Sequence, residues 1–281
     1  MSKTEIRMAR PVIARRWTGL VATGVAVGLA VSGAAQAAAP TTGGIAPAAD
    51  HLWLIAGSEG GEGGESGAAP VGSDATVELL VGLAKVEAHA LSGLDLAAAG
   101  QGEAGVTQLQ AAKDEILAQI APALAARKTP LFEAELLALT DAVAAGKDAV
   151  ALGDAHVALQ AGLEAARAAI APSAHDELAA VLALTRESAD DFTIGVKDGQ
   201  IAELGEYQDA RAYLLATNET LVRLSGSADA TVKAAADKSA AALAPVIAGM
   251  PDVAPTGTVT MDSATILSAA ARIELASYPV K

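Results

Sequence analysis

From Ser73 to the C-terminus the sequence is dominated by Ala and Leu and is interrupted by Gly or Pro at intervals of about one helix length. This pattern predicts amphipathic helices, and short connections favour antiparallel neighbours. No alternation typical of a β-strand is longer than 256–261. We therefore expect an all-α fold, an antiparallel up-and-down bundle of about seven to eight helices. The expected helices are 73–100, 103–127, 130–146, 148–171, 173–196, 203–224, 228–248 and 262–277.

Several expected helix ends carry specific signals. Thr129-Pro130 has the order of an N-cap followed by proline at the first helical position. Ser173 and Asp176 have the spacing of a capping box, and Asp262 is an expected N-cap. Pro122 lies inside the second helix, where it removes a backbone donor and predicts a bend.

The first 72 residues differ in character from the rest. Residues 1–38 combine a basic start, a short apolar run and an Ala-rich segment, the pattern of a secretory signal peptide, with an uncleaved anchor helix as the alternative. Residues 39–72 are rich in Gly, Pro and Glu and predict a flexible linker. A periplasmic or secreted protein is therefore expected. Pro172 divides the remainder into an N-terminal helical bundle, 73–171, and a C-terminal helical region, 172–281.

Charge and composition exclude several classes of function. The chain has no cysteine, which excludes thiolate metal sites and cysteine catalysis. Residues 1–38 carry five Lys or Arg and one Glu, so residues 39–281 have a formal net charge of −18, against −14 for the whole chain. Such an acidic chain repels nucleic acid and suits cations or basic partners, although acidic surfaces also serve solubility. The four histidines form no zinc-protease motif, and no nucleophile or phosphate-binding motif is present, so no enzyme is expected.

Carboxylates are the remaining chemical resource. Glu187 and Asp191 fall four residues apart and hence on one helical face. Asp198 lies in the turn that follows, where Gly199 suits a left-handed conformation, and Glu206 lies on the next helix. A cation would relieve the repulsion between these acids. The alternative is an acidic face that water solvates and screens.

The same stretch carries a family resemblance. Its residues are Asp191-Phe192, Val196, Asp198-Gly199, Ile201 and Glu206-Tyr207. They resemble the pattern D-[YF]-x-x-x-V-x-D-G-x-[IV]-x-x-x-x-E-Y of the periplasmic helical region of bacterial FTR1-type iron permeases. The likeness is close over 187–224 and looser as far as Glu274. The membrane helices of those permeases are absent, so transport itself is not implied.

The first half bears a fainter likeness to periplasmic helical proteins with a G-H-L-x-x-G-x-x-L-x-x-x-G stretch followed by a histidine pair and a glutamate. His89, Gly93 and Gly100 keep the first spacing, and Glu115 takes the place of the later acid. The histidine pair is replaced near 107–110. This likeness implies His89 and Glu115 as ligands, and the alternative is an ordinary packed histidine.

Taken together, the resemblance implies an exported accessory protein that binds iron or another divalent or trivalent cation and serves a membrane iron permease. The expected ligands are Asp191, Asp198, Glu206, Tyr207, Glu187, His89 and Glu115. The competing hypothesis is a helical scaffold that binds no metal.

Overall fold

A computed structural model describes residues 75–281 of the protein, and the predicted signal peptide and linker lie outside this range. The described region is all-α apart from one small hairpin, and it contains eight helices when α2, η3 and α3 count as one continuous helix. The predicted fold class and helix number are confirmed. The elements are α1 Ala75–Ala98, α2 Gly102–Ala111, the π-helical turn η3 Ala112–Leu117, α3 Ala118–Ala126, α4 Glu133–Ala144, α5 Ala149–Ile170, α6 Ala174–Gly195, β1 Val196–Lys197, β2 Gln200–Ile201, α7 Leu204–Leu224, α8 Ala230–Ala248 and α9 Ser263–Ser277.

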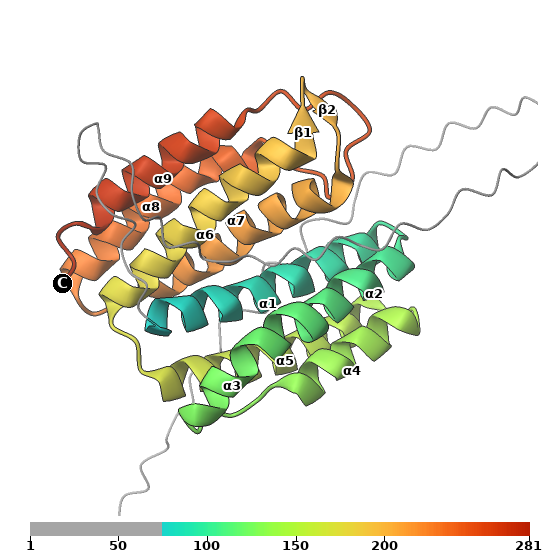
Figure 1. Ribbon diagram of the computed structural model, residues 1–281, viewed down its shortest axis with the longest axis horizontal. Coiled ribbons are helices and arrows are strands. Elements are labelled where there is room, and N and C mark those ends of the chain that lie inside the picture. The colour runs from blue at the N-terminus through green and yellow to red at the C-terminus, as the bar shows by residue number, and fades with distance from the viewer. Residues whose placement is uncertain (1–74) are drawn as a thin grey trace, which may run out of the picture. The chain divides into compact units, whose positions relative to one another are not determined.

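The helices lie side by side in two layers, with α6–α9 in one and α2–α5 in the other (Figure 1). Helix α1 lies between the layers and packs on both of them. One apolar core fills the space among α6–α9, and a second fills the space among α1–α5. A smaller cluster joins α1 to α6 and α7 through residues such as Ala88, Leu184 and Tyr213. Because α1 packs on both layers, the interruption between α5 and α6 at Pro172 does not divide the helices into two separately packed groups.

Most of the predicted helix ends are present. The Ser173 hydroxyl accepts from the backbone N–H of Asp176, and the Asp176 carboxylate accepts from the backbone N–H of Ser173, which completes the predicted capping box. Asp262 caps α9 through the N–H of Thr265. The prediction for Thr129-Pro130 was wrong, because α4 begins at Glu133 with Phe132 as its N-cap. Phe132 is fully buried, so core packing rather than capping fixes where this helix begins.

The turn between α6 and α7 is a β-hairpin. Val196 pairs with Ile201, and Lys197 with Gln200, in antiparallel register. Asp198 and Gly199, the two residues between them, both have positive φ, 53° and 73°. This is the backbone of a type I′ turn, which favours the Asp-Gly sequence found here. The predicted left-handed Gly199 is confirmed, and the two short strands were not foreseen.

Helices α6 and α7 approach each other closely where the hairpin joins them. A Cβ on Gly195 would lie 2.5 Å from the backbone nitrogen of Tyr207 and 2.9 Å from its Cα. Only glycine leaves room for this contact. The close approach brings the last turn of α6 against the first turn of α7, and it sets the acids of the two helices near one another.

The second helix contains a wide turn. The π-helical segment η3 lies between α2 and α3, and the helix then continues through Pro122 to Ala126. A bend was predicted at Pro122. The departure from α-helical geometry lies instead at Ala112–Leu117, upstream of the proline. π-helical turns inside α-helices are rare and often occur near functional sites.

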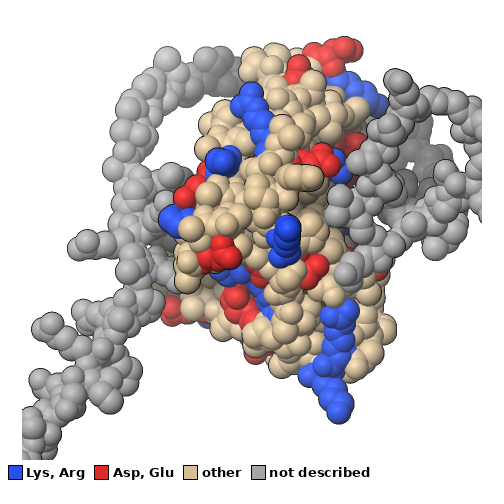
Figure 2. Space-filling model, turned by 90° about the vertical axis from the view of Figure 1, so that its left-hand side faces the viewer, with Lys and Arg blue, Asp and Glu red and all other residues tan. Residues whose placement is uncertain are grey.

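The surface of the described region is mixed in charge. Figure 2 shows acidic and basic side chains interspersed on the face that it presents. Between residues 75 and 281, no helix is both long enough and apolar enough to cross a membrane.

Candidate functional site

Four acids from α6 and α7 gather beside α1. We call Glu187, Asp191, Glu206 and Asp209 the carboxylate cluster. Burial and, to a smaller extent, the charges of the other three acids raise the pKa of Asp191 to about 8. Four residues that lie apart in the sequence therefore share one electrostatic environment. At neutral pH the cluster holds a proton on Asp191 that an isolated Asp would have lost.

A lysine from α1 lies among these acids. The Lys85 ammonium forms an ion pair with Glu187 and lies 5.5 Å from the centre of the Tyr213 ring. Its charge opposes the rise in the pKa of both Asp191 and Asp209. Lys85 is thus a resident counter-ion of the carboxylate cluster, and its side chain is only 20% exposed.

A buried histidine borders the cluster on the side of α2. His89 Nδ1 lies 2.5 Å from Gln108 Oε1, so Nδ1 carries a proton and donates it to the amide oxygen. The same nitrogen lies 3.8 Å from Asp209 Oδ1, which is buried and has no hydrogen-bond partner. Burial raises the pKa of Asp209, while the nearby His89 lowers it.

Glu115, in the π-helical turn, also acts on this end of the cluster. Its charge raises the pKa of Asp209, and its side chain is exposed. Of the seven expected residues, Glu187 and Glu206 therefore act on Asp191, while His89 and Glu115 act on Asp209.

The other two expected residues lie elsewhere. Asp198 occupies the exposed hairpin turn and does not contribute to the pKa shift of Asp191. The Tyr207 hydroxyl donates to the backbone carbonyl of Asp252 at 3.1 Å, and its ring packs against Phe192 in the core. Arg211 holds the same loop through the carbonyl of Met250 and reaches Asp95 on α1. Tyr207 and Arg211 therefore fix the 250–253 loop. The Tyr207 hydroxyl is engaged in this contact and does not point to the carboxylate cluster.

Sequence reasoning missed Lys85, Gln108, Asp209 and Tyr213. A signal existed for Asp209, which lies three residues after Glu206 on the same helical face. The resemblance in the first half places the replaced histidine pair near Thr107 and Gln110, and Gln108, which lies between them, is the residue that meets His89. The contribution of Lys85 has no sequence signal, because it depends on how α1 packs between the layers.

The carboxylate cluster is not a closed coordination shell. Across residues 75–281, no three or more His, Asp or Glu side chains are arranged to hold a metal ion as they stand. Ion pairing of Glu187 with Lys85 accounts for part of this. A cation would have to displace the ammonium, or the proton on Asp191, before the carboxylates could close around it.

A second polar group lies on the opposite side of α1. Glu87 Oε1 accepts from His156 Nε2 and from Gln160 Nε2, each at 3.1 Å. Glu87 and His156 are both buried, and Glu87 Oε2 has no partner. These contacts tie α5 to α1, and we assign them a structural role.

The similarity to known proteins concerns the last four helices. Helices α6–α9 enclose a single core, and the hairpin residues Val196 and Ile201 pack against it. The C-terminal region matches the iron permease-associated 4-helix bundle domain. The match covers residues 170–279, which contain the whole of α6–α9 and the carboxylate cluster. No curated protein and no solved structure matches the chain.

The match confirms the resemblance read from the Asp191–Tyr207 pattern. It covers the C-terminal region, while α1–α5 lie outside it. The matched domain is thus a four-helix bundle that is associated with iron permeases.

Proposed function

We propose that this protein is an exported accessory in the handling of iron or another metal ion, and that it binds a cation at the carboxylate cluster before passing it to a membrane permease. The observation that carries the proposal is that Asp191 shares its surroundings with three other carboxylates of α6 and α7, and that one lysine pairs with Glu187 beside them. Oxygen ligands suit hard cations such as ferric iron. The match to an iron permease-associated domain favours iron among them.

Capture of the cation would proceed by exchange of positive charge. Asp191 holds a proton and Glu187 holds Lys85 in the metal-free protein. An incoming cation favours the ionised form of Asp191, so its proton leaves. Glu187 can then turn from the ammonium to the cation. Both steps are reversible. If Asp191 takes up a proton again and Glu187 returns to Lys85, the cation is released.

Calorimetric titration with ferrous iron under anaerobic conditions tests this proposal. We expect binding that weakens at least tenfold in Asp191→Asn and Glu206→Gln, and about one proton released per cation, seen as a dependence of the heat on the buffer. Asp198→Asn is the matched control and should bind as the parent chain does. Equal affinity in all four proteins would remove the carboxylate cluster as the site.

A helical scaffold that binds no metal is the second candidate, and one observation favours it. Several residues of the family pattern have structural roles, since Val196 and Ile201 form the hairpin and Tyr207 holds the 250–253 loop. A pattern of this kind can preserve shape alone. Absence of heat with ferrous iron, ferric citrate and calcium would favour the scaffold.

A further inference from the structure

A small cavity lies where α1 and α5 meet α6 and α7. Its volume is about 10 Å³, close to the smallest space that holds one water molecule. Leu80, Ala84 and Val181 supply apolar walls, and Arg167, Thr217 and Arg223 supply polar ones. It lies apart from the carboxylate cluster, and the residues of the cluster do not line it.

The Thr217 hydroxyl has no partner in the structure. Its side chain is 1% exposed, and Oγ1 makes no hydrogen bond. Other threonines in the described helices behave differently: Thr140, Thr185 and Thr193 each donate to the carbonyl four residues earlier. A buried hydroxyl without a partner is destabilising, because it has given up its hydrogen bonds to water and gained none in return. Thr217 is therefore one residue of this cavity whose hydrogen bonding is incomplete.

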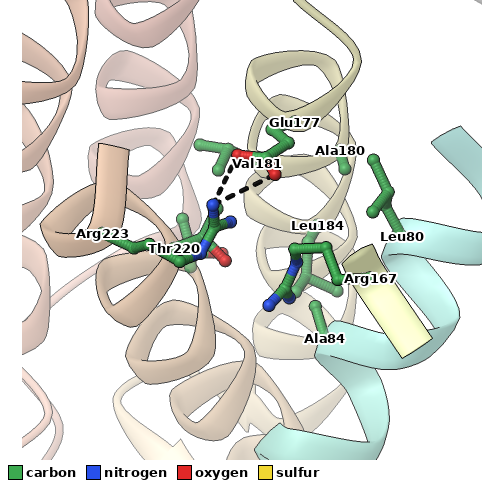
Figure 3. A pocket seen from close by; sticks show the side chains of 10 residues that line it. Leu80, Ala84, Arg167, Glu177, Ala180, Val181, Leu184, Thr220 and Arg223 are labelled. Carbon is green, nitrogen blue, oxygen red and sulfur yellow. Dashed lines mark hydrogen bonds and ion pairs between the residues drawn. The ribbon is translucent and has the colours of Figure 1, made fainter. Parts of the chain in front are cut away.

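Arg223 has a second unsatisfied group. Its Nη1 donates to both carboxylate oxygens of Glu177, at 3.0 and 2.8 Å, whereas its buried Nη2 donates to no atom in the structure. Figure 3 shows the guanidinium groups of Arg223 and Arg167 turned toward the same space from opposite sides. Burial and the charge of Arg223 lower the pKa of Arg167, and the charges of Glu164 and Glu177 oppose this lowering.

We propose that the cavity binds one small hydrogen-bond acceptor, a water molecule or a halide ion, held by Thr217 Oγ1 and Arg223 Nη2. The ligand satisfies both buried groups at once and fills a space that no side chain fills. It joins helices inside the matched family domain, α6 and α7, to helices outside it, α1 and α5. The cavity is thus a bridging site at the junction of the domain with the preceding helices.

The sign of one substitution tests whether the cavity is occupied. In Thr217→Val, a methyl group replaces the hydroxyl without a change of shape. If the cavity is empty, the variant loses an unsatisfied polar group and its Tm rises. If a ligand is bound, the variant loses a hydrogen bond and its Tm falls by about 2–6 °C. We expect the fall in the full chain, with Thr217→Ser, which keeps a hydroxyl, close to the parent value.

Crystallography of the full chain identifies the ligand. We expect a density peak within hydrogen-bond distance of Thr217 Oγ1 and Arg223 Nη2, and no peak in Thr217→Val. Crystals grown in sodium bromide distinguish the sources, because an anomalous signal marks a halide and its absence marks water. Either result supports the site. An empty cavity in the density, or a Thr217→Val variant whose Tm is unchanged or higher, overturns the proposal.

Discussion

Asp191 is the acid of the cluster whose pKa is raised to about 8. It is partly buried on α6, and three other acids act on it while Lys85 opposes them. A carboxyl so placed binds its proton more tightly in the folded protein than in the unfolded chain. The folded state therefore loses stability as the pH rises from about 4, where the unfolded chain ionises, to about 8, where Asp191 ionises in the folded protein.

Asp191→Asn should remove this dependence. The neutral amide needs no proton, so we expect the variant to exceed the parent chain in unfolding free energy by roughly 2 kcal/mol at pH 9, since solvent screening leaves only part of the full shift. The two proteins should converge near pH 4. Urea unfolding at both pH values measures the difference, with the exposed Asp190→Asn as the control. A gap of equal size at both pH values would contradict the raised pKa of Asp191.

Lys85→Met should strengthen the binding of a cation, whereas Asp191→Asn and Glu206→Gln should weaken it. Methionine keeps the apolar stem and removes the positive charge that lies among the acids. We expect ferrous iron to bind about tenfold more tightly, because one repulsive charge a few ångströms away is gone. Lys233→Met, which breaks an exposed pair with Asp237, is the control. Weaker binding in Lys85→Met would show that the lysine supports the site and does not compete for it.

The carboxylate cluster shows which parts of a site can be predicted from sequence. Glu187 and Asp191 are four residues apart, so the helical repeat alone predicts that they share one face of a helix. Convergence of acids from α6 and α7 follows from the turn between them, which Gly199 signals. The placement of Lys85 and Gln108 depends on packing between distant segments, and neither residue has a local signal. Asp198 was expected among the acids because of its place in the family pattern, but its backbone serves the turn.

At the scale of elements, the junction of α6 and α7 combines a predicted and an unpredicted feature. The Asp-Gly turn could be read from the sequence, while strands of two residues are too short to show alternation. Helix ends were predicted best where a side chain caps the backbone, as at Ser173 and Asp262. They were predicted least well at Phe132, where burial fixes the boundary.

Gly195→Ala should disrupt the junction of α6 and α7. The added Cβ would meet the backbone of Tyr207, which cannot move aside as a flexible side chain can. We expect a loss of about 1–3 kcal/mol in unfolding free energy, the usual cost of overpacking. Gly153→Ala is the matched control, since it lies inside α5 with no atom within 4 Å and should gain about 0.5–1 kcal/mol from helix propensity. A neutral Gly195→Ala would show that the two helices can separate without cost.

At the scale of the whole described region, α1 is the helix on which both layers depend. Its buried residues include Val77, Leu83, Val86 and Leu94, which point in different directions around its axis. The helix also carries Lys85, Glu87 and His89, so it is not apolar all round and its central position was not predicted from the sequence. The division at residue 172 follows the break at Pro172 and not the packing, in which α1 serves both sides.

Residues 170–281 produced alone should therefore be less stable than the full chain. Removal of α1 exposes the apolar side chains on α6 and α7 that it covers, among them Leu184 and Tyr213. We expect the unfolding free energy to fall by about 3 kcal/mol or more, since full burial of each large apolar side chain contributes about 1.5–3 kcal/mol. Urea unfolding measures the fall. Equal stability of the segment and the full chain would mean that α1 contributes little to the bundle of α6–α9.

The wide turn at Ala112–Leu117 has a consequence for how this region tolerates changes in length. A π-helical turn accommodates about one residue more than an α-helical turn, and each residue rotates a helix by about 100°. Loss of a single residue there would restore regular α-helical geometry and leave Ile120 and Leu124 facing the partners that now surround them, whereas a further inserted residue would turn both side chains away. Sequences that align with this segment should therefore tolerate the loss of one residue here more readily than the gain of one.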